Sequence, residues 1–205
     1  MTDRPIIFHA VSIRALAASR KSQTRRVLKL PKVGSLCIEH GRPYAQDSDG
    51  VYRPVKAPYA VGDKLWVREG LHLNRQLNLW FYRADGQLVT LPHGDLRIPE
   101  MVAWAHHKEG DACSSIHMPR WASRWTLTVT AVKVERLQEI SEADAEAEGV
   151  EPILVPPDGG SCPHVEGYRE LWNHLHGPGA WETNPWVAAV SFEARKGNID
   201  SGENR

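Results

Sequence analysis

The sequence predicts an α+β fold, in the form of a compact β-barrel with short flanking helices and loop insertions. Short strand-type runs recur along the chain, helical patterns are few and brief, and the two do not alternate as in βαβ units. At 205 residues, the chain is long enough for one substantial domain. We expect one domain over residues 1–195, with insertions near 31–57 and 70–115, and a disordered tail over 196–205.

The first elements are expected from local residue patterns. Residues 5–10 form a short strand-type run, and residues 11–19 carry apolar side chains and alanines at helical spacing, with Ser12 as the N-cap. The run at 25–30 returns as a strand. The first insertion is rich in proline and glycine, and its Asp-Gly pair at 49–50 predicts a hairpin within a loop.

The middle of the chain is dominated by strands. Residues 59–69 place a Gly-Asp turn before a strand, and residues 79–91 suit a hairpin that turns at an Asp-Gly pair. Residues 100–110 fit a short helix. The run at 124–137 alternates apolar and polar side chains for longest, and it is the clearest strand.

The last third combines two helices with a strand. Residues 141–149 form a helix that begins with Ser141 as N-cap, carries acids in its first turn and ends at Gly149. Residues 167–177 repeat apolar side chains at helical spacing and predict an amphipathic helix. Residues 186–195 form the last strand.

The composition favours a cytoplasmic protein without a membrane partner. Lysine plus arginine and aspartate plus glutamate both total 25, so the formal net charge is zero, whereas proteins that coat nucleic acid are usually strongly basic. No apolar run approaches the roughly 20 residues of a membrane span, and the N-terminus lacks the apolar core of a secretory signal. The three cysteines are few and widely spaced, which suits a reducing compartment.

The charge is nevertheless uneven along the chain. Residues 1–30 are strongly basic, and residues 139–151 contain acids without a cation. Two such segments either pair within the fold or face different partners, and the sequence leaves both open.

Five segments follow one another along the chain: RALAASRKSQTRR, VGDKLWVRE, the long strand, ISEADAEAEGV and WVAAVSF. Their order resembles that of the ASCH superfamily, whose members have a PUA-like β-barrel related to RNA-binding domains. The tryptophan-rich form with IHMPRWASR at 116–124 resembles proteins commonly carried by phages and prophages. The resemblance covers most of residues 4–194 and implies the PUA-like fold for this chain.

The resemblance extends to a small bacterial group within the superfamily that hydrolyses N4-acetylcytidine to cytidine and acetate. That group uses a lysine and a threonine in an RK-x-x-T segment, plus a glutamate in a later acidic helix. Residues 20–24 match the segment, and Glu148 falls where the family places its glutamate. The resemblance therefore implies an amidohydrolase for N4-acylated cytidine or cytosine, with Lys21, Thr24 and Glu148 as catalytic residues and with no cofactor. This chain departs from those enzymes in being nearly twice as long.

Two mechanisms are compatible with these three groups. In the first, which we favour, Thr24 is the nucleophile, Lys21 is its base and Glu148 protonates the departing amine. Lys21 can act as a base only if burial or nearby cations lower its pKa by about 3 units. In the second, charged Lys21 polarises the acyl oxygen while Glu148 activates water.

Five further residues are expected to bind the substrate. Arg20 and Arg26 flank the catalytic segment, and Trp66 and Trp121 could stack on a nucleobase, although core packing is the more common role of a tryptophan. Glu69 could accept a hydrogen bond from a cytosine amino group, or simply end a surface strand.

The sequence alone leaves other functions open. The chain could be a PUA-like module that recognises RNA or a modified DNA base, with Lys21, Arg25 and Arg26 on phosphates. It could also be a ribonuclease that uses Lys21 and Glu148 as acid and base. The charged run at 20–26 could equally decorate a solvated turn. We expect a nucleoside-sized partner, with nucleic acid as the alternative, and leave the oligomeric state open. The histidine and cysteine spacings match no common zinc motif, so we expect no metal.

Overall fold

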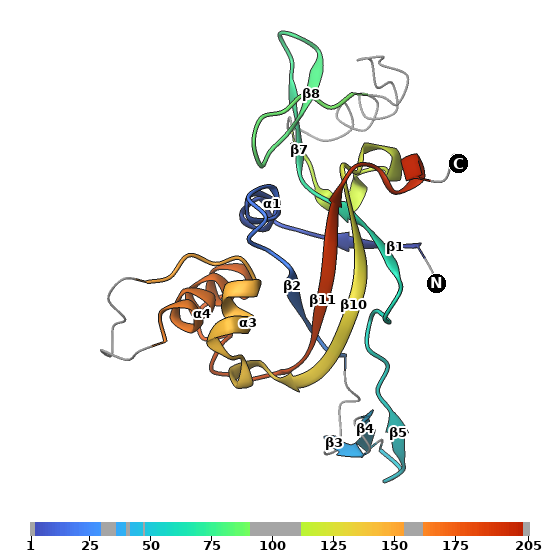
Figure 1. The fold of residues 1–205 in the computed structure, drawn as a ribbon, viewed down its shortest axis with the longest axis vertical. Coiled ribbons are helices and arrows are strands. Elements are labelled where there is room, and N and C mark those ends of the chain that lie inside the picture. The colour runs from blue at the N-terminus through green and yellow to red at the C-terminus, as the bar shows by residue number, and fades with distance from the viewer. Residues whose placement is uncertain are drawn as a thin grey trace. The chain divides into compact units, whose positions relative to one another are not determined.

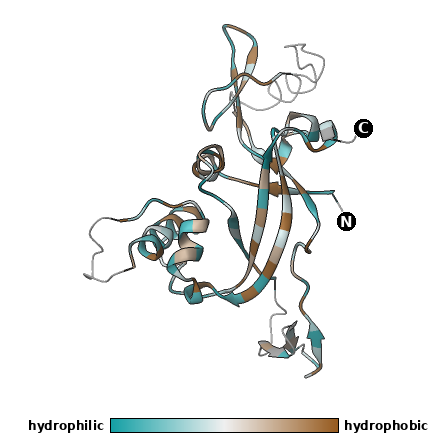
Figure 2. Cartoon of the chain, in the orientation of Figure 1, coloured by the Kyte–Doolittle hydropathy of each residue, from teal (hydrophilic) through white to brown (hydrophobic). Residues whose placement is uncertain are grey.

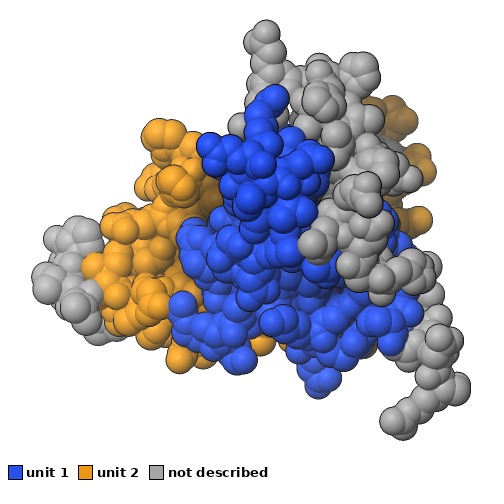
Figure 3. Space-filling view, turned by 90° about the horizontal axis from the view of Figure 1, so that it is seen from above, with its two compact units in different colours: residues 1–20, 62–128, 193–205 blue, residues 21–61, 129–192 orange. Residues whose placement is uncertain are grey.

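The structure of this chain is a computed structural model. It describes six stretches of the chain, which are residues 3–29, 36–39, 42–46, 48–90, 112–153 and 162–202. The fold is α+β, as predicted (Figure 1). The chain divides into two compact units, which Figure 3 colours separately, formed by residues 1–20, 62–128 and 193–205 and by residues 21–61 and 129–192. The long strands β10 and β11 run from one unit into the other.

The main sheet has five strands in a mixed arrangement. Their order is β1 (Asp3–Ile7), β6 (Lys64–Arg68), β10 (Trp125–Arg136), β11 (Trp186–Lys196) and β2 (Gln23–Val27). β1 pairs with β6 in parallel, whereas β6 with β10 and β11 with β2 are antiparallel. β1 and β2 stand at the two ends of the order, and the strands within the described ranges form no closed barrel. The strand predicted at 124–137 is confirmed, and Figure 2 shows its mixture of hydrophobic and hydrophilic residues.

The first unit contains a second sheet and several short helices. The sheet has the order β8 (Leu79–Tyr82), β7 (Leu71–Asn74) and β9 (Ala112–Cys113). The helical elements are α1 (Ala10–Ala17) and the 3-10 turns η1 (Ser115–His117), η2 (Arg120–Ala122) and η4 (Ile199–Gly202). A hydrophobic cluster fills this unit, with the members Leu71, Leu73, Trp80, Tyr82, Val89, Cys113, Met118 and Ala122.

The second unit contains two helices and the third sheet. The sheet has the order β3 (Leu36–Glu39), β4 (Arg42–Gln46) and β5 (Tyr52–Pro54), and the predicted hairpin at 49–50 is confirmed as the β4–β5 connection. The helical elements are η3 (Leu137–Glu139), α3 (Glu142–Ala147) and α4 (Pro163–His176). Their apolar faces share a cluster with the members Leu137, Ile140, Ala145, Val150, Tyr168, Trp172, Trp181 and Val187.

The predicted helix starts are right in one case and wrong in another. Ser141 caps α3, because its hydroxyl accepts a hydrogen bond from the amide of Asp144 at 3.1 Å. Ser12, by contrast, lies inside α1, whose N-cap is His9. His9 has extended backbone and forms no side-chain capping bond, so the helix begins directly after β1 without the polar cap that the sequence pattern favours. The helix expected at 100–110 lies outside the described residues.

A disordered tail was expected over residues 196–205, but Lys196 ends β11 and residues 199–202 form η4. The side-chain amide of Asn198 donates to the backbone oxygens of Arg120, Trp121 and Ser123, at 2.8, 3.1 and 2.9 Å. Ile199 is buried beside it. The two hydrogens of this amide are thus shared among three carbonyl groups, a role that a polar composition does not reveal. No helix within the described stretches is long and apolar enough to span a bilayer.

Candidate functional site

The segment before β2 is fixed by backbone contacts on both sides. The amide of Ser22 donates to the carbonyl oxygen of Ala147 at the end of α3, and the carbonyl of Ser22 accepts from the amide of Phe192 in β11, both at 2.8 Å. Lys21 is thereby placed next to the C-terminus of α3, where Glu148 is the C-cap residue. Gly149 follows with a φ of 83°, a left-handed conformation that suits glycine and ends the helix.

Lys21 and Glu148 form a buried ion pair. The Lys21 Nζ atom donates to Glu148 Oε2 at 2.7 Å and to the Glu148 backbone oxygen at 2.8 Å. The two residues are only 5% and 4% exposed. Glu148, rather than Glu146, is therefore the acidic residue of this helix that contacts Lys21.

The pKa of Lys21 lies below its ordinary value of 10.5. Burial is the main cause, because it disfavours the charged amine, and the nearby Arg26 and Arg25 add repulsion. Glu148 acts in the opposite direction through its charge and its hydrogen bond, but it does not outweigh burial. A neutral amine has two N–H groups, enough to donate both hydrogen bonds to Glu148. The mechanism in which Lys21 is a base requires a lowered pKa, and the pKa of Lys21 is indeed lowered.

Arg25 ties this pair to further buried charges. Its side chain is fully buried and donates to Glu135 Oε1 from Nη2 at 2.7 Å and from Nε at 3.2 Å. It also contacts Glu148 Oε1 at 3.3 Å and Asp144 Oδ2 at 3.5 Å. The second oxygen of Glu135 pairs with exposed Lys133 at 2.6 Å. The basic N-terminal segment and the acidic helix therefore pair within the fold, which decides between the two readings that the sequence left open.

Tyr168 of α4 completes the surroundings of Glu148. Its hydroxyl hydrogen-bonds to Glu148, and burial, together with the negative charge of Glu148, raises the pKa of Tyr168 well above 10. The Arg25 guanidinium carbon lies 5.8 Å from the centre of the Tyr168 ring. Glu148 is thus held by an amine and a guanidinium from residues 21–25 and by a phenol from α4.

Gly167 lets α4 approach the segment that follows Glu148. A Cβ atom at this position would lie 2.5 Å from the backbone oxygen of Glu151. We expect Gly167→Ala to lower the free energy of unfolding by about 1–3 kcal/mol, because backbone atoms must shift. In an unobstructed helix interior the same change stabilises by about 0.5–1 kcal/mol, so the sign of the effect in urea unfolding tests the close approach. A more stable variant would contradict it.

Thr24 is not joined to this pair by the contacts within the described residues. It is buried in β2, where it is opposite Val190 of β11. The neighbouring side chains of Gln23 and Arg25 contact Asp144 and Glu148, and side chains alternate along a strand, so Thr24 lies on the other face. The structure brings two of the three predicted catalytic residues together and leaves the role of Thr24 a prediction.

The predicted substrate-binding residues divide between the two units. Arg26, half-buried in the second unit, acts on Lys21 through its charge. Arg20 is exposed in the first unit. Trp66 is buried there in β6 with the Arg68 guanidinium 4.4 Å from its ring centre, and Trp121 packs against the hydrophobic cluster of that unit.

Glu69 and the arginines that flank Trp121 also have structural partners. Glu69 accepts hydrogen bonds on both carboxylate oxygens from Arg124, at 2.7 and 2.8 Å. Arg120 pairs with Asp3 and Asp200, both at 2.6 Å. The segment from Arg120 to Arg124 is thus a corner whose cations are already bound to carboxylates.

Sequence reasoning missed Arg25, Glu135 and Tyr168 as members of the site. Tyr168 was expected only as part of an apolar helix face, and Glu135 ends an alternating strand without any local sign of burial. Arg25 was expected on a phosphate in the nucleic-acid alternative. Its complete burial between Glu135 and Glu148 makes that placement wrong.

No metal centre is evident within the described ranges, where no three histidine, cysteine, aspartate or glutamate side chains are grouped to hold an ion. Comparisons with family models, curated proteins and solved structures found no match to this chain. Any assignment of function therefore depends on the geometry of the site and on the motifs of the sequence.

Proposed function

We propose that the chain is an amidohydrolase that removes the acyl group from N4-acylated cytosine or cytidine. The observation that carries the proposal is the buried contact of 2.7 Å between Lys21 Nζ and Glu148 Oε2. These residues are 127 positions apart in the sequence, and they are the lysine and the glutamate that the motif resemblance selects. A perturbed lysine with a buried carboxylate partner is typical of acid–base sites.

In the proposed reaction, one proton is passed between the reacting groups. Neutral Lys21 takes the proton of the nucleophile, which is the Thr24 hydroxyl or a water molecule, as the nucleophile attacks the acyl carbon. The bond between the acyl carbon and N4 then breaks. The proton, shared between Lys21 and Glu148 through their hydrogen bond, passes to N4 and leaves a free amine. If Thr24 is the nucleophile, water hydrolyses the resulting ester and restores the hydroxyl.

We further propose that the fold is the PUA-like fold of the ASCH superfamily. The α+β class and the mixed five-stranded sheet are compatible with it. The nucleic-acid-binding alternative draws less support, because the arginine it requires on a phosphate is engaged by buried carboxylates.

The test is hydrolysis of a panel of N4-acylcytosines and N4-acylcytidines by the purified protein. We expect N4-acetylcytidine to release cytidine and acetate, and chromatography measures both products. Thr24→Val, which keeps the shape but removes the hydroxyl, abolishes turnover if Thr24 is the nucleophile and spares it if water attacks directly. Thr24→Ser is the matched control that keeps the hydroxyl. Absence of turnover across the whole panel would overturn the proposal.

A further inference from the structure

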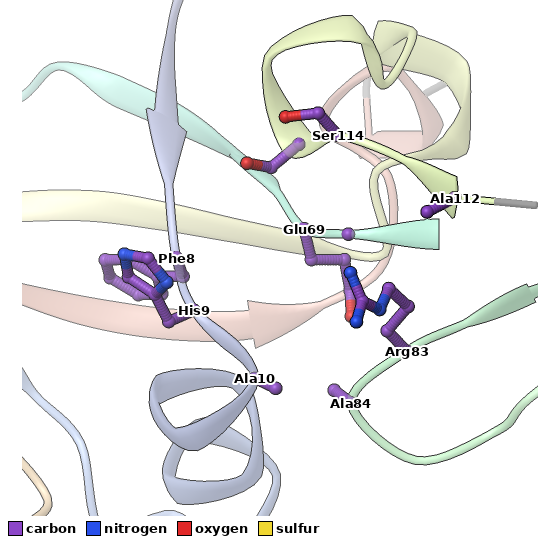
Figure 4. Close-up of a pocket in the computed structure, with 10 residues that line it drawn as sticks. Phe8, His9, Ala10, Glu69, Arg83, Ala84, Ala112 and Ser114 are labelled. Carbon is purple, nitrogen blue, oxygen red and sulfur yellow. The ribbon is translucent and has the colours of Figure 1, made fainter. Parts of the chain in front are cut away.

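The first unit contains a cavity of about 510 Å³, within the size range of small-molecule sites. Its lining comes from four separate stretches of the chain, which Figure 4 shows around the space. These stretches are the β1–α1 junction, the β6–β7 junction, the turn after β8 and the segment from β9 into η1. Lys21, Thr24 and Glu148 are not among the residues that line this cavity, whereas Glu69, one of the residues expected to bind the substrate, is.

Arg83 supplies an available cation to the cavity. It is exposed, and its guanidinium forms no ion pair or hydrogen bond with another residue in the part of the chain that the structure describes. Its aliphatic stem lies against Gly70, because a Cβ atom there would be 3.2 Å from Arg83 Cδ. The glycine therefore allows the stem to lie flat along the cavity wall.

The carboxylate of Glu69, which also lines the cavity, is hydrogen-bonded to a different arginine. Both of its oxygens accept hydrogen bonds from Arg124, and its side chain is 2% exposed. Asp85, the next acid in this network, is bound by the same arginine at 2.7 Å. The negative charges near Arg83 are thus already engaged by another guanidinium.

The remaining lining combines hydroxyl groups with small apolar side chains. Ser114 and Ser115 contribute hydroxyls, and His9 lies on the side of the cavity opposite Arg83 (Figure 4). Ala10, Ala84 and Ala112 leave room between these polar groups. A guanidinium with hydroxyl donors suits an oxyanion, because arginine binds carboxylate and phosphate groups with two parallel hydrogen bonds.

We propose that this cavity binds a small anionic molecule, whose carboxylate or phosphate group is held by Arg83 and the serine hydroxyls. The body of the molecule fills the space between the alanines and His9. The proposal is independent of the hydrolytic site and stands or falls separately from it.

The test adds matched pairs of charged and neutral probes to the full chain. Binding is measured from the NMR chemical shifts of the backbone amides. The phosphate pair is ribose 5-phosphate and ribose, and the carboxylate pair is benzoate and benzamide. We expect at least one anion to shift the amides of the lining residues saturably, while its neutral counterpart does not. The pair that responds tells phosphate from carboxylate.

Arg83→Gln is expected to weaken that binding about 10-fold or more, as the loss of a charge-assisted hydrogen bond implies. Arg75→Gln, which removes the same charge from an exposed position of the same unit, should leave the affinity unchanged. The amide spectrum of each variant also shows whether the unit remains folded. Equal affinity in Arg83→Gln and the wild type, or no saturable shift with either anion, would overturn the proposal.

Discussion

Replacement of Arg25 by methionine is expected to lower the free energy of unfolding by about 3–5 kcal/mol, the usual cost of removing one partner from a buried ion pair. Methionine fills most of the volume of the arginine stem but offers no donor. Glu135 keeps only the exposed Lys133, and Glu148 loses one of its three partners. The cost arises because a buried carboxylate without hydrogen bonds is poorly stabilised relative to water.

Urea unfolding of the Arg25→Met variant measures this effect. Arg169→Met is the matched control, because Arg169 pairs with Glu166 one turn away on α4 and its side chain is 37% exposed, whereas that of Arg25 is fully buried. Such exposed pairs contribute about 0–1 kcal/mol. Adding Glu135→Gln to Arg25→Met should recover part of the loss, since it removes the stranded charge. If Arg25→Met and Arg169→Met cost the same, the buried cluster would not carry the stability that its geometry indicates.

Replacement of Lys21 by methionine is expected to reduce turnover of an N4-acylcytidine by about 10²–10⁴-fold, the usual contribution of a general acid–base group. The fold should survive, because Glu148 retains Arg25 and the Tyr168 hydroxyl. Lys21→Arg separates the two mechanisms. Arginine keeps the charge but is never neutral, so it rescues an electrostatic role and cannot replace a base.

The pH dependence gives a second readout of the same group. A lysine that acts as a base works in its neutral form, so kcat/KM rises as the pH passes upward through its pKa. Because burial lowers the pKa of Lys21, this rise should occur below 10.5. A rate that falls over the same range, with full activity in Lys21→Arg, would contradict the base and favour the charged role.

The sequence predicted local elements better than the connections between them. The alternation at 124–137 and the Ser141 cap depend on neighbouring residues, and both are confirmed. Whether the sheet closes into a barrel depends on pairing between strands far apart in the sequence, and no local pattern encodes that pairing. The predicted cap at Ser12 was wrong, since α1 already begins at Ala10 with His9 as its N-cap.

The site was accessible from the sequence only in part. The family resemblance selected Lys21 and Glu148, which the structure joins, and the opposite charge runs left pairing of the two segments as one of two alternatives. Nothing in the sequence indicated that Arg25 would be fully buried or that Glu135 would meet it. Those facts follow from the tertiary fold, which buries Gln23, Thr24 and Arg25 in succession in β2 and buries Glu135 near the end of β10.

The two hydrogen bonds from Lys21 to the side chain and backbone of Glu148 also limit how the length of α3 can change. α3 has six residues between its cap at Ser141 and Glu148, and each residue advances a helix by about 100°. A single insertion or deletion there would swing the carboxylate away from the amine while Ser141 stayed in place. Length variation in relatives that keep this pair is therefore expected to spare these six positions.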